Sequence, residues 1–212
     1  MFYLFKYNKP VNTPISPKYH KLNNDVKKKY VEQDSIIYDS DMTLLQSLMG
    51  SKAPRDIISD LSLIYVDYYS FDFKIHRGQL LVNKRCEESL KAIFREIKLM
   101  RFPILAVVPI VMYDWNDSIS MISNNSSGFN YRFVDGSKKL SKHADGFAVD
   151  INPLLNPYVN YKSVRPPTAV YDTAKLGTLS KNSAVVSIFK RHGWKWGGDW
   201  RKIKDYQHFY KE

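Results

Sequence analysis

The sequence predicts an α+β fold built from a small, mainly antiparallel sheet flanked by helices. Three observations lead to this prediction: short runs of β-forming residues, two amphipathic helical patterns, and no regular strand–helix alternation along the chain. A parallel α/β sheet would need that alternation, because parallel strands are usually connected through a helix. With 212 residues, the chain is long enough for one sizeable core plus an extension.

The first quarter of the chain is polar and weakly patterned. Three prolines within the first 17 residues interrupt any regular element. We interpret residues 1–55 as an N-terminal extension with one short helix around Met42–Met49, and residues 56–212 as the main domain.

The central part of the chain is expected to contain two strands and a long helix. Leu61–Tyr68 is rich in β-forming residues, and Gln79–Val82 is a second candidate strand. Asn83 can cap a helix that runs to about Met100, because apolar residues from Cys86 onwards recur at i, i+4, i+7, i+8 and i+11. The single cysteine lies on that apolar face, so we interpret it as a core residue.

The segment after this helix is expected to alternate between strands and a loop. Pro103–Val108 is apolar and predicts a buried strand. Residues 114–127 are polar and predict a loop, and Phe129–Phe133 predicts a further strand.

Towards the C-terminus, the alternation over Phe147–Ile151 predicts a strand with Asp150 on its polar side. A long loop rich in Pro and Asn, residues 152–179, is expected to follow. Ser183–His192 has the apolar pattern of a helix that stops at a glycine, and Tyr206–Tyr210 is expected to be the last strand.

The composition favours a protein with an anionic partner. The formal net charge is +11, which suits nucleic acid or an acidic cell envelope. No helix-turn-helix, zinc-finger or RNA-binding motif is present, so we expect no specific nucleic-acid recognition. No apolar run approaches the roughly 20 residues of a membrane helix, and no signal peptide or other export route is visible. We expect a monomer.

Two short segments offer ligands for one metal ion. They are Ser141–Asp150 and Asp205–His208. A catalytic zinc site usually takes three protein ligands and leaves a fourth position for water. His143, Asp150 and His208 would supply such a set, and the aspartate that opens the second segment would remain to act on the water. The alternative is that both histidines are structural, hydrogen-bonded residues, which is also our interpretation of the other three.

Glycine and tryptophan are concentrated around these segments. Clustered glycines mark tight turns and close backbone approach. Trp194, Trp196 and Trp200 would provide rigid walls, either in the core or in a substrate cleft.

These motifs resemble those of the zinc D-alanyl-D-alanine carboxypeptidase family, which includes vancomycin-resistance D,D-peptidases and phage L-alanyl-D-glutamate endolysins. The carrying patterns are Ser-x-His-x-x-Gly-x-Ala-x-Asp at 141–150, and Trp-Gly-Gly-Asp-Trp at 196–200 followed by Asp-x-x-His at 205–208. Residues 124–132 also resemble the arginine-bearing strand of one branch. The likeness extends from about Asp60 to Phe209.

The resemblance implies a hedgehog-like and D,D-peptidase-like zinc fold for residues 56–212. It implies a zinc metallopeptidase that hydrolyses peptidoglycan stem peptides, as a D,D-carboxypeptidase or an L-alanyl-D-glutamate endopeptidase. The site of action would be the cell envelope or the extracellular space, where anionic envelope polymers are further candidate partners.

The resemblance also implies roles for individual residues. Asp205 would be the general base that takes a proton from the zinc-bound water. Arg132 would bind a substrate carboxylate or stabilise the oxyanion, and Ser141 would support the site by hydrogen bonding. Trp196 joins Arg132 and Ser141 in the expected substrate-binding set. The implied zinc ligands are His143, Asp150 and His208.

Two positions depart from the family pattern. Asp145 stands where relatives often carry Tyr, and this predicts a more acidic pocket. Tyr210 stands where many relatives carry an acidic residue, so one supporting contact of the site is expected to differ.

Rival functions have weaker support. A serine D,D-peptidase would use Ser187–Lys190, but the Ser-Asp-Asn and Lys-Thr-Gly partners are absent. A thermolysin-like protease needs His-Glu-x-x-His, which is also absent. A non-catalytic zinc module of the same fold, binding cell wall or protein, is the main alternative. The presence of Asp205 and Arg132 beside the ligands favours an enzyme.

Overall fold

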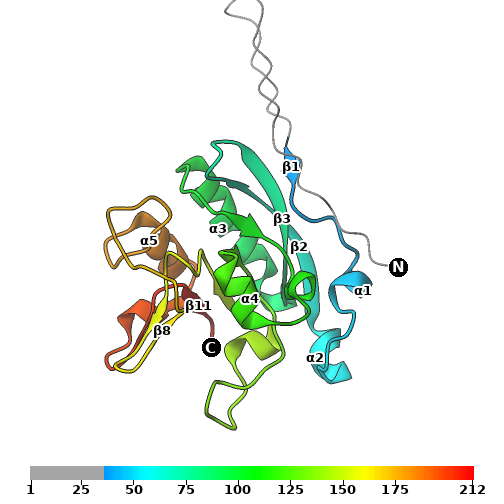
Figure 1. Ribbon diagram of the computed structural model, residues 1–212. Helices are drawn as coiled ribbons and strands as arrows, with labels where there is room; N and C mark the ends of the chain where they lie inside the picture. Colours follow the sequence, from blue (N-terminus) through cyan, green and yellow to red (C-terminus); the bar gives the residue numbers. More distant parts are fainter. Residues whose placement is uncertain (1–35) are drawn as a thin grey trace, which may run out of the picture. The chain divides into compact units, whose positions relative to one another are not determined.

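The structure is a computed structural model that describes residues 36–212 (Figure 1). Most of the predicted N-terminal extension, residues 1–35, lies outside the described residues. The rest of it contributes a short strand, β1 (Ile37–Tyr38), and a short helix, α1 (Leu44–Ser47), within the predicted Met42–Met49 range. The predicted α+β class is confirmed, because short sheets and a few helices pack together in the described part.

The remaining elements follow in chain order. The helices are α2 (Arg55–Ser59), α3 (Glu87–Leu99), α4 (Asp117–Ile122) and α5 (Ala184–Arg191), with 3-10 turns η1 (Lys84–Cys86), η2 (Ile110–Tyr113), η3 (Lys142–Asp145) and η4 (Gly197–Asp199). The strands are β2 (Leu61–Tyr69), β3 (Ile75–Asn83), β4 (Ala106–Val107), β5 (Asn125–Ser126), β6 (Ala148–Asp150), β7 (Tyr158–Val159), β8 (Val164–Arg165), β9 (Lys195–Trp196), β10 (Lys204–Asp205) and β11 (His208–Tyr210).

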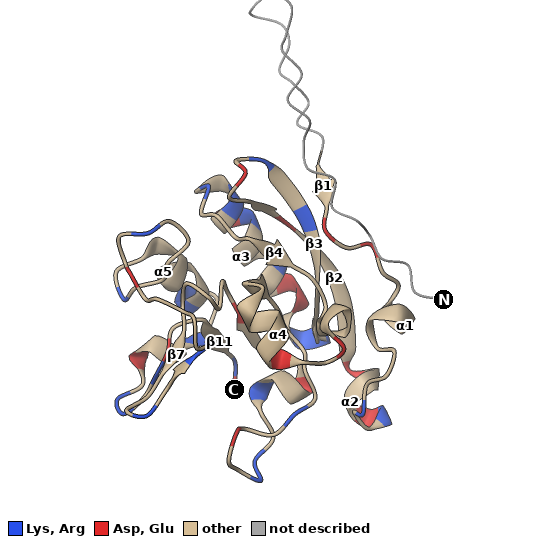
Figure 2. Cartoon of the chain, in the orientation of Figure 1, with Lys and Arg blue, Asp and Glu red and all other residues tan. Residues whose placement is uncertain are grey.

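Charged residues are spread over the described elements rather than gathered in one stripe, as Figure 2 shows. Within residues 36–212, no helix combines the length and the apolar character that crossing a membrane requires.

The first sheet is the long β2–β3 hairpin with β1 added in parallel beside β3. The predicted strand at Leu61–Tyr68 is confirmed. The second strand starts earlier than expected, at Ile75, because the antiparallel register continues to the Tyr69–Ile75 pair. Helix α3 packs against β2, and its apolar face is buried as its spacing predicts. Cys86 is fully buried at the start of this face, and burial raises the pKa of its thiol to about 11.

The second sheet has the order β6-β11-β9 and carries the predicted C-terminal strands. Its inner face joins the same core as the first hairpin, since Val149 and Phe209 are buried against residues of α3 and α5. Phe189 of α5 stacks on Phe209 with ring centroids 3.7 Å apart. The predicted helix at Ser183–His192 is confirmed, and the Ser183 hydroxyl caps it by accepting from the Val186 backbone N–H.

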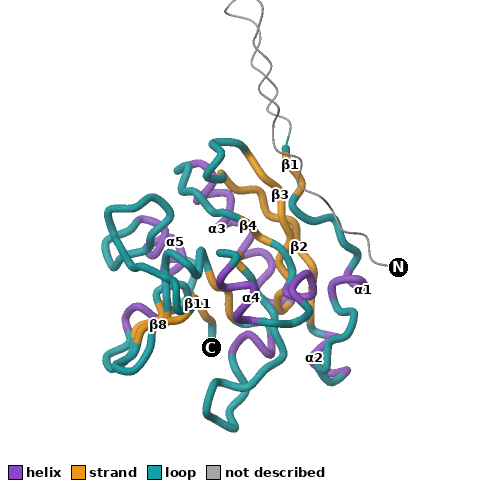
Figure 3. The backbone as a smooth tube through the Cα atoms, viewed as in Figure 1, coloured by secondary structure: helices purple, strands orange, loops and turns teal. Residues whose placement is uncertain are grey.

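The segment from 103 to 127 differs from its prediction (Figure 3). Only β4 is regular strand within Pro103–Val108, and the predicted loop contains α4 and β5. The Asn125 side chain explains part of this, because it donates to the Val108 carbonyl and accepts from its N–H, both at 3.0 Å. A side chain thus replaces the hydrogen bonds that a longer strand would make. The Asn116 side chain caps α4 by accepting from Ile119 N–H.

The predicted strand at Phe129–Phe133 was wrong. Phe129 N–H donates to the Leu81 carbonyl at 2.7 Å, and Asn130 N–H donates to the His143 carbonyl at 3.0 Å. These partners lie on two different segments, so the chain crosses between them instead of pairing along one. Phe129 is buried in a packing cluster and Phe133 is exposed, so the aromatic residues of this segment do not indicate a strand. The predicted loop 152–179 also contains the β7–β8 hairpin, which pairs with β10.

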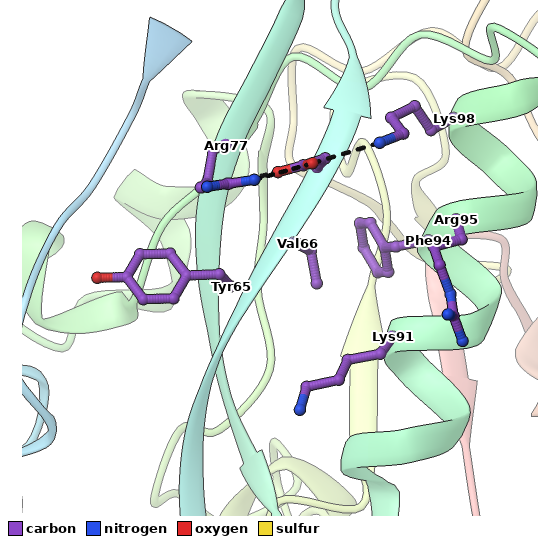
Figure 4. A pocket seen from close by; sticks show the side chains of 8 residues that line it. Tyr65, Val66, Arg77, Lys91, Phe94, Arg95 and Lys98 are labelled. Atoms are coloured by element: carbon purple, nitrogen blue, oxygen red, sulfur yellow. Dashed lines mark hydrogen bonds and ion pairs between the residues drawn. The ribbon is translucent and has the colours of Figure 1, made fainter. Parts of the chain in front are cut away.

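An ion-paired carboxylate links the hairpin to α3 (Figure 4). Asp67 of β2 accepts from Arg77 Nε at 2.6 Å and lies 3.3 Å from Lys98 Nζ of α3. These groups line a pocket of about 150 Å³ beside Phe94. The hydrogen bond from Arg77, opposed by burial and helped by Lys98, lowers the pKa of Asp67 below its usual 3.8.

We predict that Asp67→Asn destabilises the protein in a pH-dependent way. A carboxylate with a lowered folded-state pKa stabilises the fold above its unfolded-state pKa, and this contribution is lost as pH falls through the folded-state value. The loss in unfolding free energy should therefore be about 1 kcal/mol near neutral pH, after solvent screening, and should shrink below about pH 4. Denaturant unfolding at several pH values measures it. Asp60→Asn, at an exposed carboxylate with no ion pair in the described chain, is the control, and an equal loss there would contradict the prediction.

Candidate metal centre and cleft

Three elements bring the predicted ligands together. His143 lies on η3, Asp150 ends β6 and His208 begins β11. In the antiparallel register of β6 and β11, Asp150 stands directly opposite His208. Strand alternation sends their neighbours Val149 and Phe209 into the core, so the carboxylate and the imidazole share the other face.

The ligand atoms converge on one point. His143 Nε2 lies 3.2 Å from His208 Nδ1 and 3.2 Å from Asp150 Oδ1, and His208 Nδ1 lies 2.9 Å from the same oxygen. Bonds of about 2.1 Å to a tetrahedral ion would separate its ligands by roughly 3.4 Å, close to these distances. All three residues are buried, and together they could hold a metal ion.

A hydrogen bond on the ring edge away from the other two ligands orients the His143 imidazole. Its Nδ1–H donates to the Gly128 carbonyl at 2.5 Å, which leaves Nε2 to face the other two ligands. The Ser141 hydroxyl accepts from the His143 backbone N–H at 3.3 Å and caps the turn. The turn ends at Gly146, where φ is +76° and an added Cβ would lie 2.4 Å from the Asn83 backbone nitrogen. The end of β3 therefore packs directly against the segment that carries His143.

In this cluster, the charges of Asp150 and His143 shift each other's pKa values. Burial alone would raise the pKa of Asp150, but His143 and His208 hold it well below its usual range. Burial would lower the pKa of His143, but the Asp150 charge raises it above its ordinary value. A carboxylate that stays ionised between two imidazoles is a suitable site for a cation.

Asp205 lies beside this cluster with different properties. It ends β10, and its Oδ1 is buried without a hydrogen-bond partner. Burial, opposed by His208 and reinforced by the Asp150 charge, raises the pKa of Asp205 to about 6. The residues that could share one ion do not include it. Asp205 thus offers a free oxygen next to the ligands rather than a fourth ligand.

Arg132 also reaches the site, and an unexpected residue holds it. Its Nη2 donates to Asp117 Oδ2 at 3.1 Å, while its Nε is buried without a partner. The Asn130 side chain donates to the other oxygen of Asp117 at 3.2 Å. Asp117 was not predicted as a site residue because residues 114–127 were expected to form a loop, although Asn116 is a recognisable helix cap.

The ligands open into a cleft of about 1090 Å³. Asp205, Arg132 and Ser141 line it as well, so the structure brings all of these predicted residues together. Such a volume is enough for a peptide-sized ligand.

The expected place of Trp196 in the substrate-binding set is wrong, because Trp196 lies in the core and Trp200 lines the cleft. Trp196 is only 2% exposed, lies in the core, and donates from Nε1 to the Tyr206 carbonyl at 2.8 Å. Trp200 lines the cleft instead, with its ring 5.7 Å from that of His208, and donates to the Tyr210 hydroxyl. Asp145 does not line the cleft, whereas Tyr210 does and stacks on His208.

The other described histidines have separate partners. His76 contacts Asp39 and Asp72, and His192 contacts Glu96. His20 lies outside the described residues.

We predict that the purified chain binds one divalent metal ion at this centre. His208→Ala removes a ligand and should weaken binding by at least about 100-fold, which isothermal titration with a divalent metal measures. His192→Ala removes a histidine of the Glu96 pair and is the matched control. Equal affinity of the two variants would place the metal elsewhere.

Comparison with known proteins agrees with the motifs. Residues 135–211 match the family model described as D-alanyl-D-alanine carboxypeptidase, and no solved structure matches the chain. The matched segment contains the three ligands and Asp205, but not Arg132 or the β2–β3 hairpin. The resemblance seen in the sequence is thereby confirmed for residues 135–211, which are similar to the D-alanyl-D-alanine carboxypeptidase family of peptidases.

Proposed function

We propose that this protein is a zinc peptidase that hydrolyses peptide bonds in peptidoglycan stem peptides, at the cell envelope or in the extracellular space. The observation that carries the proposal is the convergence of three buried ligands on one point of a large cleft, with the free oxygen of Asp205 beside them. The family match supports peptide hydrolysis as the reaction class.

Zinc suits the ligand set. Two imidazole nitrogens and one carboxylate oxygen are ligands that zinc accepts readily, and three protein ligands leave a position for water. When bound, zinc would lower the pKa of that water from 15.7 to roughly 7. His143 and His208 would present Nε2 and Nδ1 to the ion, and Asp150 would supply the negative charge.

Asp205 is suited to proton transfer. Its buried Oδ1 accepts no hydrogen bond from the protein, so a lone pair remains for a proton from the attacking water. With a pKa of about 6, the carboxyl group can take up this proton and pass it to the leaving amine. A carboxylate at its ordinary pKa would hold the proton less well.

Arg132 is suited to bind a carboxylate of the substrate. Asp117 engages Nη2, which orients the guanidinium, while Nε lacks a partner. A planar guanidinium can make a two-point contact with a carboxylate or stabilise the charge that develops on the scissile carbonyl.

Digestion of purified sacculi, followed by mass spectrometry of the products, tests the proposed function. Loss of terminal D-Ala would identify a D,D-carboxypeptidase, whereas free L-Ala ends would identify an L-alanyl-D-glutamate endopeptidase. Unchanged muropeptides in the presence of zinc would contradict the proposal and favour the non-catalytic alternative.

Asp205→Asn should separate proton transfer from metal binding. The amide keeps the size of the side chain but cannot accept the proton, so turnover should fall by about 10²-fold or more. Metal content should stay near that of the unmodified protein, because Asp205 is not a ligand. Hydrolysis rate and elemental analysis check the two parts. Asp199→Asn, at an exposed carboxylate paired with Lys190, is the control and should keep both.

Arg132→Lys should impair substrate use without loss of metal. Lysine keeps the charge but loses the planar two-point contact, so kcat/KM on a stem peptide should fall at least about tenfold. Arg191→Lys, at an exposed arginine paired with Glu96, makes the same change outside the cleft and should have little effect. Near-full activity of Arg132→Lys would show that Arg132 has only a structural role.

A further inference from the structure

Two segments, here called the lips, contribute side chains to the lining of the cleft. One is the loop 133–140, closed at its base where Ser141 N–H donates to the Arg132 carbonyl at 3.0 Å. The other is the β7–β8 hairpin, which pairs through Tyr158 with Asp205 of β10. Figure 2 shows Lys and Arg on both segments. Both lips are therefore anchored directly to residues of the candidate active site.

An ion pair joins the two lips. Arg165 Nη1 of the hairpin donates to Asp135 Oδ2 of the loop, and both residues line the cleft. This contact joins two segments about 30 residues apart in the sequence and places them side by side at the cleft. The substrate channel thus has a defined rim beyond the metal ligands.

The rim has unpaired positive charge. Lys139, Lys142 and Lys162 line the cleft, and none forms an ion pair with a described residue. The acidic residues that line the cleft form no ion pair with these lysines. Asp117 pairs with Arg132, Asp135 with Arg165, Glu212 with Lys195, and Asp150 with the two ligand histidines, while Asp205 lies buried beside them.

Aromatic rings accompany two of these lysines. Lys162 Nζ lies 5.2 Å from the centroid of the Tyr161 ring, and Lys142 Nζ lies 6.0 Å from that of Phe147. Such contacts bias the ammonium groups toward defined positions without neutralising them. The three charges remain free to attract an anion.

We propose that Lys139, Lys142 and Lys162, here called the lysine rim, form a second anion subsite that selects peptides carrying a carboxylate in addition to the one bound by Arg132. The inference rests on the proposed function, because it concerns the substrate of the same cleft. One exposed ion pair contributes little, but several like charges around a cleft with low-dielectric walls concentrate anionic ligands. The lysine rim therefore acts on substrate choice and not on the chemical step.

Two stem pentapeptides test this subsite. They differ only in one side-chain carboxyl group, which is free in the first peptide and a carboxamide in the second. Their affinities are measured by calorimetry on the zinc-loaded full chain carrying Asp205→Asn, which suppresses turnover. Amidation should weaken binding about three- to tenfold, and added salt should weaken the acidic peptide more.

Substitution of the lysine rim should abolish the difference. The triple variant Lys139→Gln, Lys142→Gln, Lys162→Gln should bind both peptides with equal, low affinity. Lys52→Gln, Lys175→Gln, Lys181→Gln removes the same charge from exposed sites outside the cleft and should keep the preference.

Each outcome decides one question. Equal binding of the two peptides by the unsubstituted rim overturns the subsite but leaves the proposed function in place. An equal loss of preference in both triple variants also overturns it, because net charge alone would then be responsible. Binding of neither peptide overturns the proposed function and the subsite together. The peptide pair and its salt dependence decide the matter even where the rim variant fails to fold.

Discussion

The pairing of β6 with β11 is the constraint on which the site depends. It sets Asp150 opposite His208, and the same two-residue periodicity places Val149 and Phe209 in the core on the reverse face. A shift by one residue would turn both ligands inward and both core residues outward. The hydrophobic core therefore fixes the register of the candidate metal ligands, and the stacking of Phe189 on Phe209 stabilises that register from the core side.

The third ligand depends on a different part of the fold. The end of β3 holds the turn of His143 through Asn83, whose N–H donates to the Gly146 carbonyl at 3.0 Å. Leu81 holds the segment of Gly128, whose carbonyl orients the imidazole ring. The β2–β3 hairpin, which lies outside the family match, thus acts as the rigid support for residues within it. The two aspartates differ in the direction of their pKa shift. The imidazoles keep Asp150 ionised, whereas burial raises the pKa of Asp205 to about 6, which suits a general base.

The sequence was most informative where one local pattern decides the structure. The apolar spacing of α3 and α5, the β-rich run of β2 and the ligand motifs all lie within short windows, and the structure agrees with them. Prediction failed where a distant side chain takes the place of the backbone, as Asn125 does at Val108. It also failed to distinguish Trp196 from Trp200, because burial of an indole depends on residues distant in the sequence that pack around it. The Asp117–Arg132 pair was not predictable, since nothing local to either residue indicates the other.

The spacing of the ligands along the chain also affects how the protein folds. Asp150 and His208 are 58 residues apart, and His143 and His208 are 65 apart. Closing such loops costs conformational entropy that local contacts cannot offset, so the complete ligand set exists only once the long-range topology has formed. A metal ion would bind the dispersed ligands of the unfolded chain much more weakly than the assembled set. The binding free energy of an ion held there would therefore add to the stability of the native state, and the metal supply would influence the fraction of chains that stay folded.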